Sequence, residues 1–185
     1  VGPYDIPAYY MEHKKQQAVA MENAKQVILD IAAEFEKISG RKYGLFETYK
    51  LDDAECALVI INSAAGTAKD AVDKLRAEGK KVGLLKIRVF RPFPAEEIAE
   101  ALKNVKAIAV MDRCEGFSSQ GGPLGAEVKS ALYTAGATSK VVDYVYGIGG
   151  RDVRVENIEE VYNALFDILE TGNVGETYRY LSLRD

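Results

Sequence analysis

The stretch of residues 105–132 places the tightest constraint on what this chain can fold into. It opens with a nearly continuous apolar run that ends in Asp112 and Arg113, as is typical of a strand buried on both faces. A polar, glycine-rich loop follows. After Pro123, which suits the first position of a helix, apolar residues recur every three to four positions. This order predicts a loop at the carboxyl end of a strand, where open α/β sheets place their binding crevices.

The rest of the chain alternates between the same two patterns. Apolar runs typical of strands occupy residues 45–49, 56–61, 82–89, 107–112 and 141–146. Helical spacing is found in residues 11–39, between Thr67 and Gly79, and in residues 95–102, 123–132 and 155–171. The alternation predicts an α/β fold of three layers, α/β/α, with a mostly parallel sheet of about five strands. The sequence identifies no partner for residues 178–181.

Composition narrows the class of function. A net charge of −4 without a basic cluster argues against a nucleic-acid partner. No segment reaches the ~18 apolar residues of a membrane span, so we expect no membrane partner. The two cysteines, Cys56 and Cys114, suit a reducing cytoplasm, and the single histidine, His13, excludes a histidine-rich metal site. We expect a cytoplasmic chain with no metal ligands of its own.

Three polar loops follow predicted strands, and parallel strands would bring these loops to one edge of the sheet. The candidates in them for an interface or a ligand-binding loop are Ser63, Gly66, Thr67, Arg113, Gly121, Gly122, Gly147, Gly149, Gly150, Arg151 and Asp152. None of the loops matches a dinucleotide fingerprint, a Walker A loop or a nucleophile elbow. None of them is therefore a recognised phosphate cradle or nucleophile site.

Two of the loops allow two readings each. The N–H groups near Gly122 can bind an anion at the start of a helix, or Gly122 can form a turn before the Pro-initiated helix. Residues 147–152 can form a glycine turn with a local ion pair between Arg151 and Asp152. Alternatively, they can form an interface in which Arg151 forks onto a carboxylate or phosphate.

Four motifs occur together in this chain. They are Val-Phe-Arg-Pro-Phe-Pro at 89–94, Val-Met-Asp-Arg at 110–113, Gly-Pro-Leu at 122–124 with Glu-Val-Lys at 127–129, and Tyr-Gly-Ile-Gly-Gly-Arg-Asp-Val at 146–153. This set resembles the second domain of pyruvate:ferredoxin oxidoreductase. The order of elements also resembles the C-terminal domain of transketolase-like thiamine diphosphate enzymes. The resemblance extends over nearly the whole chain.

The resemblance implies an enzyme that decarboxylates pyruvate or another 2-oxoacid on thiamine diphosphate and Mg²⁺. Such an enzyme passes electrons through iron–sulfur clusters to ferredoxin and forms acetyl-CoA from CoA. The chain would be the non-catalytic C-terminal domain of the alpha subunit, with no cofactor of its own and inactive alone. It would pack against the thiamine-binding domains, and it would meet ferredoxin and CoA only through the parent complex.

On this view, residues 1–10 are a linker from an N-terminal domain and residues 11–172 are the transketolase C-terminal-like domain. Residues 173–185 are a C-terminal tail. Two alternatives remain open. One is a free-standing module that binds a small anion, CoA or a nucleotide, and the other is a dimerisation domain.

Overall fold

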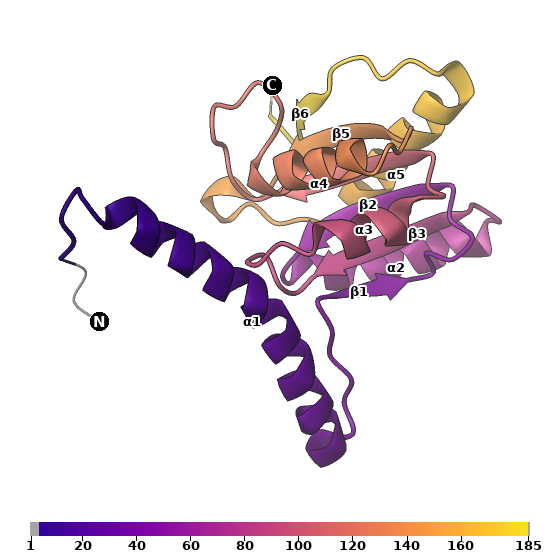
Figure 1. Cartoon of the computed structure of the whole chain (residues 1–185). Helices are drawn as coiled ribbons and strands as arrows, with labels where there is room; N and C mark the ends of the chain where they lie inside the picture. Colours follow the sequence, from indigo (N-terminus) through magenta and orange to yellow (C-terminus); the bar gives the residue numbers. More distant parts are fainter. Residues whose placement is uncertain (1–3, 185) are drawn as a thin grey trace. The chain divides into compact units, whose positions relative to one another are not determined.

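A six-stranded sheet with the order β1-β3-β2-β4-β5-β6 organises most of the chain (Figure 1). Its strands are β1 (Phe46–Tyr49), β2 (Cys56–Ile61), β3 (Val82–Ile87), β4 (Ala107–Asp112), β5 (Lys140–Val145) and β6 (Tyr178–Tyr180). β1 runs antiparallel to β3, and every other pair of neighbours is parallel. The predicted mostly parallel sheet is confirmed, with one strand more than the sequence indicates.

A layer of helices covers each face of this sheet. The helices are α2 (Ala64–Ala77), α3 (Ala95–Leu102), α4 (Pro123–Thr134) and α5 (Val155–Thr171). α2 contacts α5, and α3 contacts α4 on the near side of the sheet in Figure 1. Cys56, Leu58 and Ile60 belong to one buried cluster with side chains of α2 and α5. Because side chains alternate along a strand, Ala57 and Val59 face the other layer, which confirms the three-layer α/β/α fold.

The connections reverse direction in the middle of the sheet. From β2 the chain passes through α2 to β3, toward the β1 edge, whereas from β4 it passes through α4 to β5, toward the β6 edge. β2 and β4 are neighbours, so the reversal falls between them. Open α/β sheets bind their ligands in the crevice that forms at the carboxyl ends of strands at such a point.

The C-terminal strand β6 gives the segment 178–181 the partner that its sequence does not reveal. β6 pairs in parallel with β5, with Asp143 opposite Tyr178 and Val145 opposite Tyr180. Leu181, which follows, is 4% exposed and joins the core. A strand of three residues carries too few side chains to show an alternating pattern, so only the completed sheet identifies it.

The computed structural model describes residues 4–184, which form two compact units. Residues 46–88 and 95–184 form the unit with the sheet, and residues 4–45 with 89–94 form the other. The second unit contains the long helix α1 (Tyr10–Ser39), which ends at Gly40 as the sequence predicts. None of the helices in residues 4–184 combines the length and the apolar character needed to cross a membrane.

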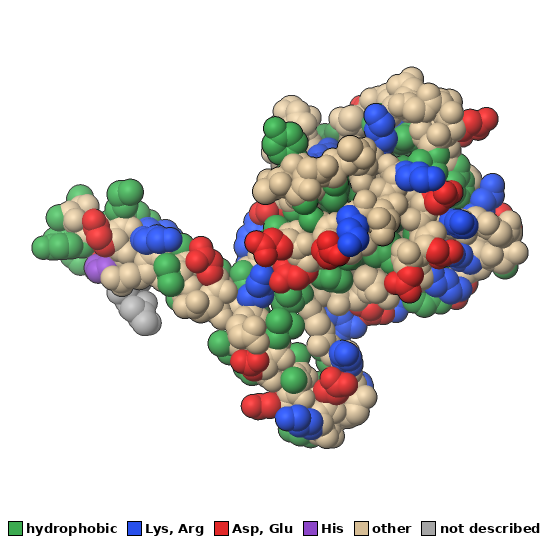
Figure 2. All heavy atoms as spheres, turned by 45° about the vertical axis from the view of Figure 1, so that its right-hand side comes forward, with side chains coloured by type: hydrophobic (Ala, Val, Ile, Leu, Met, Phe, Trp, Pro, Cys, Tyr) green, Lys and Arg blue, Asp and Glu red, His purple; other side chains and the backbone are tan. Residues whose placement is uncertain are grey.

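Helix α1 leaves its apolar side chains uncovered. It has no buried residue, and the exposed fractions of Val27, Ile31 and Ile38 are 53%, 60% and 86%. Figure 2 shows hydrophobic side chains exposed along this helix. A helix of 30 residues with an apolar face usually buries that face against a partner, and the other described residues of its own unit do not bury it.

Candidate functional site

The three loops predicted to share one edge of the sheet do meet there. They line a cavity of about 240 Å³, which we call the carboxyl-edge pocket. The predicted residues that line it are Ser63, Thr67, Arg113, Gly147, Gly150, Arg151 and Asp152. Asn62, Ala64, Tyr146 and Val153 complete the lining, and none of these four was among the predicted candidates. Each of them lies in or next to a loop that contains predicted candidates, and this proximity is the feature of the sequence that could have identified them.

Arg113 ties two of these loops together. Its Nε–H donates to the carbonyl oxygen of Gly147 at 3.0 Å, which joins the loop after β4 to the loop after β5. Gly147 has a φ of +63°, and a β-carbon there would lie 3.2 Å from Arg113 Nε. The glycine thus provides both the left-handed backbone and the close approach that the guanidinium needs. The carboxyl-edge pocket therefore has a fixed wall.

Gly121 and Gly122 do not line the pocket but lie against two buried carboxylates. Asp112 is 5% exposed and Asp143 is 0% exposed. The N–H of Gly122 donates to Asp143 Oδ2, and the N–H groups of Leu124 and Gly125 donate to Asp112 at 3.0 and 2.8 Å. The start of α4 thus binds anions that belong to the chain itself. This geometry supports the reading of Gly122 as part of a turn before a Pro-initiated helix.

Two effects shift the protonation of Asp143 in the same direction. Burial, first, and the neighbouring Asp112 carboxylate raise its pKa to about 7. Its Oδ1 atom is buried without a hydrogen-bond partner within residues 4–184. The only local sign of this acid in the sequence is a single Asp among the apolar residues of the strand Lys140–Val145.

A third anchor fixes the loop after β4. The hydroxyl groups of Tyr178 and Tyr180 both donate to the Glu115 carboxylate. The hydrogen bond from Tyr180, first, and the N–H of Phe117 lower the pKa of Glu115. The contact joins this loop to β6, the strand that the sequence did not identify.

In the loop of residues 147–152, Arg151 has a partner that the sequence does not reveal. Its guanidinium donates to the carbonyl oxygen of Ser182, whereas the glycine-turn reading paired it with Asp152. β6 lies beside β5, so the residues that follow β6 reach the loop that follows β5. This contact, which depends on the sixth strand, takes the place of the Arg151–Asp152 pair in the glycine-turn reading, and the interface reading stays a prediction.

The two cysteines differ in their surroundings. Cys56 is buried in the core, and burial raises the pKa of its thiol to about 12. Cys114 is an exposed free thiol. Within residues 4–184, no three His, Cys, Asp or Glu side chains lie close enough to hold a metal ion.

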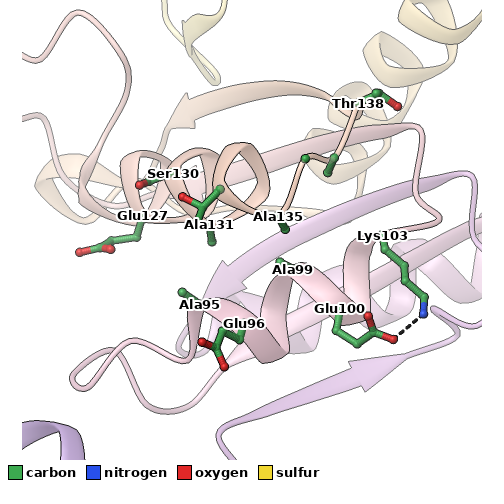
Figure 3. A pocket seen from close by; sticks show the side chains of 13 residues that line it. Ala95, Glu96, Ala99, Glu100, Lys103, Glu127, Ser130, Ala131, Ala135 and Thr138 are labelled. Carbon is green, nitrogen blue, oxygen red and sulfur yellow. Dashed lines mark hydrogen bonds and ion pairs between the residues drawn. The ribbon is translucent and has the colours of Figure 1, made fainter.

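A separate groove of about 690 Å³ lies between α3 and α4. Figure 3 shows that small side chains, among them Ala95, Ala99, Ala131 and Ala135, form its floor. The charged groups at its rim include Glu100 and Lys103, which pair with one another. None of the predicted site residues lines this groove, so the carboxyl-edge pocket remains the candidate site.

Comparison with known proteins gives a consistent result over the whole chain. The family model for "Pyruvate:ferredoxin oxidoreductase core domain II" matches residues 54–158. The chain is 46% identical over 184 residues to the pyruvate synthase subunit PorA of Thermotoga maritima, covering 100% of this chain and 46% of that protein. It is 40% identical over 185 residues to the ketoisovalerate oxidoreductase subunit VorA of Pyrococcus horikoshii, covering 100% of this chain and 47% of that protein. The chain therefore spans about half the length of the curated relatives that it matches.

A solved structure shows the same fold at lower sequence identity. It is the 2-oxoglutarate:ferredoxin oxidoreductase from Magnetococcus marinus, with 2-oxoglutarate, coenzyme A and succinyl-CoA bound. The TM-score is 0.56 at 19% identity, over 88% of this chain and 24% of that one. At this identity the likeness supports the fold alone.

Proposed function

This chain belongs to the pyruvate:ferredoxin oxidoreductase core domain II family, and from that membership we propose that it is the C-terminal, non-catalytic domain of an alpha subunit. The parent enzyme would convert pyruvate, or a related 2-oxoacid, with CoA and oxidised ferredoxin into acetyl-CoA. The observation that carries the proposal is the 46% identity, over the full chain, to a pyruvate synthase subunit. Thiamine diphosphate, Mg²⁺ and the iron–sulfur clusters would be held by other domains and subunits.

The residues of this chain suit a role in packing and assembly. Arg113 is engaged with the Gly147 carbonyl, and the two buried acids Asp112 and Asp143 are engaged with the start of α4. These groups hold the loops in place. The apolar face of α1 is exposed within its own unit, as expected of a surface that packs against the thiamine-binding parts of the enzyme. Both cysteines are free thiols, which suits a cytoplasmic enzyme.

The proposed function is tested by comparing the isolated chain with the assembled enzyme. We expect calorimetry of the chain with thiamine diphosphate and Mg²⁺ to give no heat of binding, and we expect no turnover of pyruvate. Co-expression with the remaining parts of the oxidoreductase should yield a complex that reduces ferredoxin when given pyruvate and CoA. Micromolar binding of thiamine diphosphate by the chain alone would contradict the proposal. A rise in melting temperature with CoA alone, from ligand-linked stabilisation, would favour the free-standing binding module.

The apolar face of α1 provides a second test. Ile31 is 60% exposed, so Ile31→Lys should leave the melting temperature of the chain almost unchanged. The same substitution should weaken co-purification with the other subunits, because it places a charge in an apolar interface. Asn23→Lys, which adds the same charge at another exposed position of α1, is the matched control. Equal co-purification of the two variants would show that this face of α1 makes no contact in the enzyme.

A further inference from the structure

Three arginine side chains gather at the C-terminal end of the fold. Arg151, Arg154 and Arg184 line a groove of about 770 Å³, and Asp152 is the only carboxylate among its lining residues within 4–184. We call this the basic groove. It lies beside the carboxyl-edge pocket, since Arg151 and Asp152 line both. The local excess of positive charge contrasts with the overall net charge of −4.

Among residues 4–184, no carboxylate neutralises the three guanidinium groups of the basic groove. Within residues 4–184, Arg151 donates to the carbonyl of Ser182 and none of the three pairs with a carboxylate. All three side chains are exposed. Several other cations of this sheet unit, such as Lys69, Arg76 and Arg88, do have an acidic partner. Exposed arginines that converge on one groove without acidic partners can bind an external anion.

The backbone around the basic groove also favours a negatively charged ligand. Helix α5 begins at Val155, directly after Arg154, so the positive end of a helix of 17 residues points toward the groove. The contact between Arg151 and Ser182 holds the C-terminal segment against the loop after β5, so the groove is formed by two segments fixed to the sheet. The site is therefore built from ordered elements and needs no large rearrangement to receive a ligand.

The lining of the groove selects the class of anion. Ile148, with an exposed fraction of 51%, is the only apolar side chain of its lining within residues 4–184, and that lining includes no aromatic ring. A nucleotide base would therefore have no surface on which to stack. Planar guanidinium groups pair well with carboxylates, and several of them spread along one groove match a chain segment that carries several acids.

We propose that the basic groove docks an acidic segment, rich in Asp and Glu, of a partner polypeptide. Arg154 and Arg184 bind its carboxylates, and Arg151 adds a third contact while it stays anchored to Ser182. The identity of the partner, another subunit or domain of the oxidoreductase, rests on the proposed function. The recognition chemistry rests on the groove alone.

A peptide-binding experiment on the intact chain tests this docking. The probe is a fluorescein-labelled peptide of alternating Glu and Gly, and its counterpart contains Gln in place of Glu. Fluorescence anisotropy should show that the Glu peptide binds at least ~10-fold more tightly than the Gln peptide, and that added salt weakens its binding. The variant Arg154→Gln with Arg184→Gln should lose about 10-fold or more in affinity, and it keeps the Arg151–Ser182 contact.

The control variant removes the same charge from elsewhere. Lys15→Gln with Lys140→Gln changes two exposed cations outside the groove and should leave the peptide affinity within about twofold. Equal losses of peptide affinity in the two double variants would overturn the proposal, because the affinity would then depend on the net charge of the chain and not on the groove. Binding of pyrophosphate that the Glu peptide fails to displace would also overturn it, in favour of a phosphate site. If the peptide binds as expected while the co-expressed subunits fail to assemble, the proposed function is contradicted, whereas the proposal that the basic groove binds an acidic segment is supported.

Discussion

Replacing Gly125 with alanine should destabilise the chain by about 3 kcal/mol, a large fraction of the stability of a domain of this size. A β-carbon at this position of α4 would lie 2.3 Å from Asp143 Oδ2 and 2.6 Å from its Cγ. The acid is fully buried, so it has no open space into which to move. Denaturation in urea, followed by circular dichroism, measures the free energy of unfolding of both proteins.

Gly66 provides the matched control for this substitution. It also lies in a helix, α2, but a β-carbon there would meet no heavy atom within 4 Å. Gly66→Ala should therefore leave stability unchanged or raise it by up to ~1 kcal/mol through better helix propensity. In the background of Asp143→Ala, the cost of Gly125→Ala should fall, because the clashing carboxylate is gone. Equal costs of Gly125→Ala in both backgrounds would show that another contact is responsible.

The chain should lose stability as the pH rises from about 4 to about 7, and Asp143→Asn should abolish this loss. The folded chain holds the pKa of Asp143 near 7, well above its ordinary value of 3.8. Between these values the folded state keeps a proton that the unfolded state releases, so each step up in pH favours unfolding. Below pH 4 both states are protonated, and the contribution is fully present. Above pH 7 both are ionised, and the loss is complete, on the order of 4 kcal/mol.

The measurement is the free energy of unfolding of the two proteins at pH 4, 6 and 8. The amide of Asn carries no charge, so the variant should be the more stable protein at pH 8, and its advantage should shrink toward pH 4. Taking the difference between the proteins cancels the acids with lowered pKa, such as Glu47 and Asp73, which act in the opposite direction at low pH. Asp70→Asn, at an exposed position, should keep the wild-type profile. A constant difference across this range would mean that Asp143 is ionised throughout in the folded chain.

The parts of the fold that the sequence predicted are those with strong local signals. β2 and β4 are runs of six residues that are almost wholly buried, and their apolar sequences identified them directly. The meeting of three loops at one edge followed from the parallel arrangement alone, since parallel strands end on the same side. The long helix α1 was predicted to within one residue, from its periodic pattern and from Gly40.

The parts that the sequence missed depend on contacts between distant residues. β6 has three residues, and only its pairing with β5 defines it. The partner of Arg151 was missed for the same reason, because Ser182 reaches the loop only once β6 is in place. The glycines at 121 and 122 were placed in a polar loop, with an anion site or a turn as the two readings of Gly122, and the structure shows that both make room for Asp112 and Asp143. No local pattern reveals that two acids lie beneath a glycine-rich turn.

The lengths of the six strands also affect how this chain can associate with others. β1, with four residues, and β6, with three, are the two outermost strands, whereas each of the four strands between them has six. An outer strand exposes unpaired N–H and C=O groups along its free side, and a long one invites a foreign strand to extend the sheet. Here both outer strands are short and offer a foreign strand few groups to pair with. We therefore expect association through side-chain surfaces, such as the face of α1 and the basic groove, and not by backbone pairing at the edges of the sheet.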